Sequence, residues 1–390
     1  MATIKPFRAI RPNTNVRHPL QSLNGEVGAT LELDYLKHRL EPCRSGGMPR
    51  NTECKHFFQE LLENKAYVSE DHPAIYIYER IVDGDFSTGI WALTSLGDLE
   101  KGIIARHEDT LAEKEDKLTE YRKEVALEGA PIVLTYRKSE EIKQLIKEVK
   151  STHQGFSYLY QDTYHKFWPI NTLDKIIAFK LAFEKLGQVY LADGHHRLAS
   201  AAGLHKKSAQ WISSLYYATD EIKIDAFHRL VRREANYFSP DLLGVLVKNF
   251  YISLIPNNKA FRPEIKGRFG MCLKGSWYQL DAKNNKTKMA DAEFLQQNVL
   301  LPAFKIEDAR IDPRLECFAD GKDWRKLLLE IQKDPMCVVF TLCPMEVEEL
   351  LSLSANGAIL PPKSTYITPK SPFGLLMYYS GMLVEKGAKI

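Results

Sequence analysis

The chain has 390 residues, of which 44% are hydrophobic and 26% charged, the composition of an ordinary globular protein. This length is sufficient for a large buried core and for two subdomains. The 53 basic and 50 acidic side chains leave a net charge of +3, which gives no electrostatic reason to expect a nucleic-acid partner.

Neither a leader peptide nor a membrane span is expected. The first residues, MATIKPFRAIRP, lack the apolar core of a signal peptide. No apolar run approaches the roughly 18 residues of a transmembrane helix. The six cysteines are scattered without CxxC spacing, which favours reduced, mostly buried thiols over disulfides or a zinc ribbon. The sequence therefore predicts a soluble cytoplasmic protein.

The N-terminal half alternates between strand and helix patterns. The elements that we expect there are an extended strand over 4–12, a loop over 41–50, a helix over 55–64, a hairpin of strands 73–80 and 87–93, a charged helix over 111–125, a buried strand over 130–136, a helix after Ser139, an aromatic hairpin over 157–168, a helix over 172–186 and a strand over 189–191. An Asp-Gly turn joins the first hairpin, and Gly89 in its second strand suggests a bulge.

The C-terminal half begins with strands and then changes in texture near Asn236. The elements that we expect there are strands over 211–217 and 224–232, a helix over 239–251, a hairpin over 268–280, a helix over 293–304, a strand over 337–342 and a helix over 345–354. We therefore predict two domains, 1–235 and 236–390, the second packed on the first.

The stretch with the strongest chemical content lies between the strand over 189–191 and an alanine-rich helix. It reads Asp193-Gly194-His195-His196-Arg197. A strand that turns through glycine into a helix presents free N–H groups to an anion, and Arg197 adds a fork of donors for phosphate. The alternative is a capped helix with Asp193 as N-cap, surface histidines and an ion-paired arginine.

Three further sets of polar residues carry candidate chemistry. His107 and Glu108 stand between a strand and a helix, where Glu108 is either a catalytic base or a charge that favours the helix start. His228 and Arg229 are either a phosphate-facing pair or structural. The third set either supplies hydrogen-bond donors for an anion or forms a basic surface loop, and it contains Lys363, Ser364, Thr365 and Lys370. The three sets lie in the segments HE (107–108), HR (228–229) and PPKSTYITPK (361–370).

These motifs together resemble a known family. ADGHHR between an apolar strand and an alanine-rich helix looks like the signature of the ParB/sulfiredoxin-like fold found in free serine kinases. The whole chain resembles the bacterial domain-of-unknown-function 1015 family, which is related to those kinases. His107 opens a matching HE-T-x-x-x-K-E-D pattern, and HRLV and PPKST match further motifs. Over residues 20–50 the family pattern is lost.

The resemblance implies an α+β fold, with a ParB/sulfiredoxin-like mixed-sheet core and an appended C-terminal α+β subdomain. It further implies a kinase that uses Mg²⁺ and ATP or ADP to phosphorylate a small hydroxyl substrate, most plausibly free L-serine. Glu108, beside His107, would be the general base, and Asp193 would hold Mg²⁺ or orient a histidine. The residues that would bind nucleotide and phosphate are Gly194, His195, His196, Arg197, His228, Arg229, Lys363, Ser364 and Thr365.

Two other functional classes stay open from the sequence. One is a ParB-like nucleotide-binding switch without kinase activity, although the chain has no helix-turn-helix signal. The other is a metal-dependent hydrolase that uses His107, His195, His196 and His228. In each case we expect a small-molecule ligand, no nucleic acid and no membrane partner, and the oligomeric state is left open. We also expect the ADGHHR and HE motifs to share one pocket.

Overall fold

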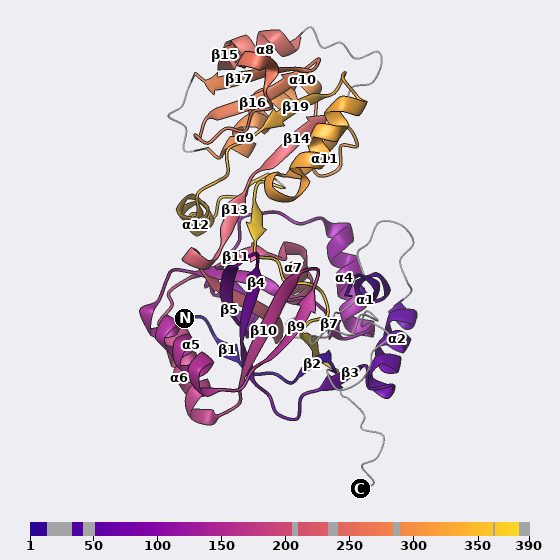
Figure 1. The fold of residues 1–390 in the computed structure, drawn as a ribbon, viewed down its shortest axis with the longest axis vertical. Helices are drawn as coiled ribbons and strands as arrows, with labels where there is room; N and C mark the ends of the chain where they lie inside the picture. The colour runs from indigo at the N-terminus through magenta and orange to yellow at the C-terminus, as the bar shows by residue number, and fades with distance from the viewer. Residues whose placement is uncertain are drawn as a thin grey trace. The chain divides into compact units, whose positions relative to one another are not determined.

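The computed structural model describes residues 1–13, 33–41, 51–204, 210–232, 241–283, 289–361 and 363–381, so most of the predicted loop over 41–50 lies outside the described residues. The chain divides by its internal contacts into two compact units. The first contains residues up to Arg106, Thr110–Ile222 and the segment from Pro369 on; the second contains His107–Asp109 and Lys223–Thr368 (Figure 1).

These two units do not follow a single boundary between residues 235 and 236, where the sequence placed the domain border. Lys223–Asp225 (β13) and Phe227–Val231 (β14) belong to the second unit because they pair with its strands Tyr366–Thr368 (β20) and Leu315–Ala319 (β18). The chain then returns to the first unit, where Met377–Tyr379 (β21) pairs with Ala9–Pro12 (β2).

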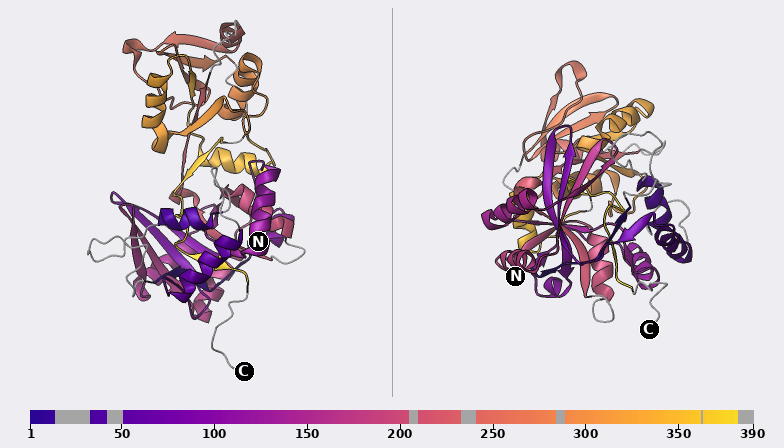
Figure 2. Two further views of the ribbon diagram at one scale, coloured as in Figure 1. Left: turned by 90° about the vertical axis from the view of Figure 1, so that its right-hand side faces the viewer. Right: turned by 60° about the horizontal axis from the view of Figure 1, so that its bottom comes forward.

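The first unit is built on a nine-stranded sheet with strand order β6-β11-β8-β12-β5-β4-β10-β9 and β1 paired to β5. Its strands are Ile4–Lys5 (β1), Ile75–Val82 (β4), Asp85–Ser95 (β5), Ile104–Ala105 (β6), Ile132–Tyr136 (β8), Phe156–Tyr160 (β9), Thr163–Ile170 (β10), Val189–Asp193 (β11) and Trp211–Ala218 (β12). Two of the pairings, β11 with β6 and β12 with β8, are parallel and the others are antiparallel. The predicted mixed sheet is thus confirmed, and its twist can be followed in Figure 2.

Helices and a smaller sheet complete the first unit. The helices are Leu33–Leu40 (α1), Asn51–Glu63 (α2), Gly97–Glu100 (α3), Ala112–Glu124 (α4), Glu140–Thr152 (α5), Leu173–Glu184 (α6) and His195–Leu204 (α7), with a short 3-10 turn at Thr219–Glu221. The small sheet has the order β3-β2-β21-β7, with β3 at Tyr67–Ser69 and β7 at Leu127–Glu128. Alternating apolar residues of the large sheet and of α5 and α6 form one core.

The local patterns of the first unit match the structure closely, with one correction. The Asp-Gly turn joins β4 and β5, and the Ser139 hydroxyl accepts a hydrogen bond from the Ile142 N–H at 3.4 Å as the N-cap of α5. The predicted bulge at Gly89 was wrong, because Gly89 pairs in regular register with Tyr78. A Cβ there would lie 2.8 Å from the Tyr216 carbonyl oxygen, so glycine permits close approach of neighbouring strands.

The aromatic hairpin β9–β10 encloses an ionisable group. His165 is 1% exposed, and its Nδ1 is 2.7 Å from the hydroxyl of Tyr78 on the neighbouring strand. Desolvation by burial, assisted by the nearby Arg80, lowers the pKa of His165 to about 3. The side chain is therefore neutral in the folded protein throughout the mildly acidic range.

The free energy of unfolding should consequently decrease as the pH is lowered. An unfolded histidine has a pKa of about 6.5, so below that value the unfolded chain takes up a proton that folded His165 does not. The lowered folded pKa makes stability highest above pH 6.5 and reduces it as pH falls. Between pH 6 and pH 5 this residue should cost about 1 kcal/mol. Urea unfolding of the wild type and His165→Gln at both pH values measures the difference, and equal pH slopes would contradict the assignment.

The second unit contains a six-stranded antiparallel sheet with the order β15-β17-β16-β19-β14-β18. Its remaining strands are Phe250–Leu254 (β15), Arg268–Leu273 (β16), Ser276–Ala282 (β17) and Val338–Thr341 (β19). Its helices are Asp241–Asn249 (α8), Asp291–Leu295 (α9), Leu301–Phe304 (α10), Asp320–Lys333 (α11) and Val347–Ala355 (α12), with a 3-10 turn at Pro256–Asn258 and a π-helical segment at Gln296–Leu300 between α9 and α10.

The second unit corrects the predicted helix over 239–251. Within the described residues that helix ends at Asn249, and Phe250 begins β15, which pairs with β17. Both units combine helices with sheets, so the predicted α+β class is confirmed. Every helix in the described ranges is too short or too polar to cross a lipid bilayer.

Candidate functional site

The ADGHHR segment is a strand, a one-residue turn and a helix, as predicted. β11 ends at Asp193, α7 begins at His195, and Gly194 between them has φ +97°. A Cβ at Gly194 would lie 2.9 Å from Arg197 Nη2 and 3.0 Å from the Ile132 side chain. Only glycine fits this conformation and this space, so the turn into α7 requires glycine at this position.

Asp193 holds two cations at the start of α7. One carboxylate oxygen accepts a hydrogen bond from Lys370 Nζ at 2.6 Å, and the other accepts one from Arg197 Nη2 at 2.7 Å. Desolvation would raise the pKa of Asp193, but Lys370 and Arg197 outweigh it and hold that pKa below its usual value. The carboxylate is therefore ionised at neutral pH and fixes both cations beside the helix terminus.

This pairing bears on the two predicted roles of Asp193. The partners that its carboxylate has in the structure are Lys370 and Arg197, rather than a histidine. The ammonium of Lys370 and the guanidinium of Arg197 also disfavour a Mg²⁺ ion on this carboxylate, because three positive charges would then repel one another. The residues at Asp193 therefore do not fit a protein-held Mg²⁺ site.

The next residue pair of the motif connects α7 to the segment that follows the HE motif. His195 is buried and His196 is half-buried. His196 Nε2 accepts a hydrogen bond from the Leu111 N–H at 3.1 Å, which requires the tautomer protonated at Nδ1. Leu111 stands three residues after Glu108 in the sequence.

The HE motif lies beside the PPKST motif within the second unit. His107 is 1% exposed, its carbonyl oxygen accepts from the Leu360 N–H at 2.7 Å, and its Nε2 is 3.4 Å from Thr365 Oγ1. Glu108 forms an isolated parallel bridge with Leu360 and is half-buried. Thr365, predicted to bind phosphate, thus contacts the imidazole of His107.

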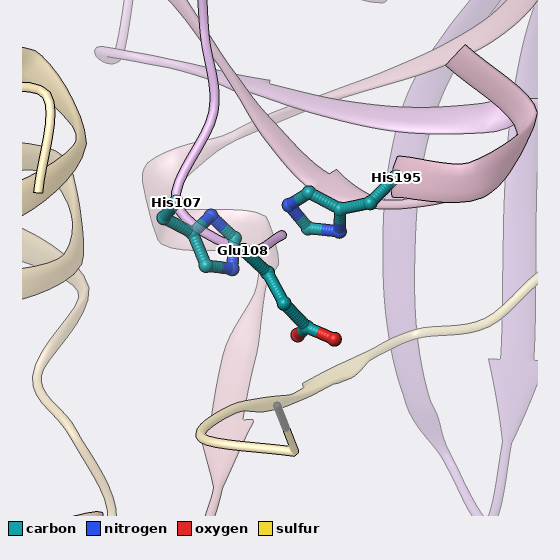
Figure 3. A group of neighbouring side chains, drawn as sticks. All are labelled: His107, Glu108 and His195. Carbon is teal, nitrogen blue, oxygen red and sulfur yellow. The ribbon is translucent and has the colours of Figure 1, made fainter. Parts of the chain in front are cut away.

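Three predicted site residues carry atoms of the kind that metal ions bind, and Figure 3 shows them. They are the imidazoles of His107 and His195 and the carboxylate of Glu108. Zinc and similar metals accept this mixture of nitrogen and oxygen donors, whereas Mg²⁺ prefers oxygen. The two imidazoles, taken by themselves, therefore suit a transition metal better than the predicted Mg²⁺.

The HRLV motif is enclosed by its own unit. His228 is 0% exposed and contacts Asp320 Oδ1 at 3.1 Å, and its Nδ1 accepts from the Leu342 N–H at 3.3 Å. Arg229 is 2% exposed and donates to the carbonyl oxygens of Phe227 and Lys363. These contacts favour the structural interpretation of the pair over a phosphate-facing one.

The polar groups of Lys363 and Ser364 also have partners within the second unit. Lys363 has φ +58°, its carbonyl accepts from Arg229 at 3.0 Å, and its Nζ lies 5.5 Å from the centroid of the Phe227 ring. The Ser364 hydroxyl donates to the Pro361 carbonyl at 2.5 Å. Lys370, at the end of the same motif, belongs to the first unit and contacts Asp193 at the start of α7.

Sequence reasoning missed Arg122, which supports the first turns of α7. Its Nε donates to Ser200 Oγ at 3.1 Å, its Nη2 donates to the Arg197 carbonyl at 3.3 Å, and its Nη1 pairs with Glu128. Its side chain is 11% exposed. Arg122 stands in a helix so rich in charges that each of them looks like solvated surface, and no sequence signal separates it from its neighbours.

Comparisons with known proteins give a family and several likenesses of fold. A family model described as "Protein of unknown function (DUF1015)" matches residues 4–301. A free serine kinase mutant in complex with AMP is 14% identical, with a TM-score of 0.42, and the match covers 74% of this chain and 90% of that one. SbnI from Staphylococcus aureus, truncated at its C-terminus, is 12% identical, with a TM-score of 0.42 and coverages of 73% and 85%.

A third solved structure, a conserved hypothetical protein from Pyrococcus furiosus, is 12% identical with a TM-score of 0.40, and the match covers 73% of this chain and 93% of that one. No curated protein matches the sequence.

Proposed function

Because the chain belongs to the DUF1015 family, whose description assigns no activity, we propose from its own residues that it transfers a phosphoryl group from ATP or ADP to a small hydroxyl substrate, foremost free L-serine. The observation that carries this proposal is the construction around Asp193. Gly194, in a left-handed backbone conformation, forms the turn into α7. The ionised carboxylate of Asp193 holds the cations of Arg197 and Lys370 beside the start of that helix.

This construction suits a nucleotide phosphate. The first N–H groups of a helix and a guanidinium are donors that match phosphate oxygens, and Lys370 adds a second positive charge. Asp193 keeps both cations in place before the ligand arrives, so little reorganisation is needed when the phosphates bind. Arg122 holds the carbonyl of Arg197 and thereby supports the same turn.

In the proposed reaction Glu108 accepts the proton of the substrate hydroxyl. The hydroxyl oxygen forms a bond to the terminal phosphorus, and the bond from that phosphorus to the bridging oxygen breaks, releasing ADP from ATP or AMP from ADP. Mg²⁺ would enter on the nucleotide phosphates, as part of the substrate, because Asp193 is engaged by two cations.

Incubation with ATP or ADP, Mg²⁺ and a panel of hydroxy amino acids tests the function. We expect phosphoserine, with ADP or AMP as the second product. Nucleotide binding without transfer to any acceptor would instead support the ParB-like switch. A cytoplasmic location belongs to the same proposal, and the five described cysteines, all free thiols, are compatible with it.

Metal-dependent hydrolysis is the second candidate, because His107, Glu108 and His195 are of the residue types that bind a hydrolytic metal ion. Elemental analysis of the purified protein separates the two candidates. A stoichiometric transition metal, with hydrolytic activity that chelation removes, would support the hydrolase. A metal-free protein that phosphorylates serine would exclude it.

Removing the guanidinium of Arg197 should weaken nucleotide binding. A charge-assisted hydrogen bond contributes about 1.5–3 kcal/mol, so Arg197→Ala should raise the dissociation constant for ATP or ADP by roughly 10- to 100-fold. The side chain is 29% exposed, which makes unfolding an unexpected result. Calorimetric titration measures the affinity. Lys185→Ala, which breaks the exposed ion pair with Glu141, is the matched control and should change nothing.

A further inference from the structure

The second unit has an edge strand whose side chains are unusually apolar. β15 pairs with β17 on one side and, among the described strands, with none on the other. Its sequence FYISL contains neither a charge nor a proline, the devices that usually protect an edge strand from pairing. Tyr251 is 66% exposed and Leu254 is 64% exposed.

The preceding helix α8 extends this apolar surface. Leu243 and Val247 stand one helical turn apart on α8 and are both exposed. Lys283 Nζ donates to the Val247 carbonyl at 2.5 Å and lies 5.4 Å from the centroid of the Tyr251 ring, so the end of α8 and β15 share a neighbour. Figure 1 shows the two elements side by side.

We propose that β15 pairs antiparallel with β15 of a second copy of this chain, forming a two-fold dimer through a continuous sheet. An antiparallel pair of identical strands is related by a two-fold axis, so one edge satisfies itself and the assembly closes at two copies. Pairing about Ile252, the middle residue of β15, places it opposite the same residue of the other copy. The inference is independent of the phosphotransferase proposal.

The apolar area exposed on α8 and β15 is large enough for an interface with a second copy of the chain. The large apolar side chains exposed there are Leu243, Val247, Tyr251, Ile252 and Leu254. Covering them in both copies would bury on the order of 1,200 Å², which is the lower end of a standard specific interface. The ladder of backbone hydrogen bonds between the two edges would add affinity and fix the register.

Analytical ultracentrifugation of the full chain tests the dimer. We expect the wild type to sediment as a dimer, and Ile252→Lys to raise the dissociation constant at least about 100-fold, because two ammonium groups would then face each other across the axis. Leu181→Lys, at an equally apolar exposed site on α6, is the control and should remain dimeric. A wild type that stays monomeric up to about 100 μM overturns the proposal, whatever else binds this surface.

A cross-link provides a second readout. Directly opposed residues of an antiparallel pair have Cα atoms about 4.5–5.5 Å apart, within the range of a disulfide. Ile252→Cys should therefore form a covalent dimer under mild oxidation, and Ile177→Cys on α6 should not. If both variants cross-link equally, or if Ile252→Lys remains dimeric while folded by circular dichroism, the edge pairing is refuted.

Discussion

Replacement of Glu108 by glutamine should lower turnover by about 10²- to 10⁴-fold and leave substrate binding near its wild-type value. The amide keeps the shape of the carboxylate and still accepts a hydrogen bond, but it does not take up a proton at neutral pH. Steady-state kinetics with serine and the preferred nucleotide give the turnover, and calorimetry gives the binding.

The competing interpretation of Glu108, a charge that favours the start of α4, predicts a different result. Loss of such a charge costs only about 0.3–1 kcal/mol of stability and leaves turnover alone. Glu113→Gln is the matched control, because Glu113 lies in the first turn of α4 and is 80% exposed. Wild-type turnover in Glu108→Gln would falsify the assignment of the base, whereas a wild-type protein inert towards every hydroxy amino acid would remove the kinase proposal itself.

Replacement of Arg229 by methionine should destabilise the protein by about 2–5 kcal/mol. Arg229 is fully enclosed, and its loss would remove its charge-assisted hydrogen bonds to the carbonyl oxygens of Phe227 and Lys363, at about 1–3 kcal/mol each. The Lys363 carbonyl belongs to the segment that carries Thr365, so the change should also loosen the contact with His107. Chemical denaturation measures the free energy of unfolding.

A second arginine of the same sheet provides the control. Arg268 on β16 is 32% exposed and pairs with Asp281, so Arg268→Met should cost less than about 1 kcal/mol. If Arg229 were instead a phosphate ligand, Arg229→Met would reduce nucleotide affinity while unfolding stayed near wild type. That pattern would restore the phosphate-facing interpretation of the HRLV motif.

Local sequence determined the elements whose causes lie within a few residues. The Asp-Gly pair dictated the turn between β4 and β5, and Ser139 with two following glutamates dictated the start of α5. Gly194 between an apolar strand and an alanine-rich run dictated the turn into α7. Each depends on backbone conformation and on neighbours along the chain, so the residues themselves suffice to predict it.

The tertiary structure decided which motifs meet and which side chains are enclosed. Lys370 reaches Asp193 across 177 residues, and Thr365 reaches His107 across 258. The enclosure of Arg229, the close approach of strands at Gly89 and the return of the chain from the second unit to the first also depend on strand order. No local pattern encodes these features, because a contact between distant segments depends on how the sheets are assembled from all their strands, whereas propensity and capping act only within a few residues.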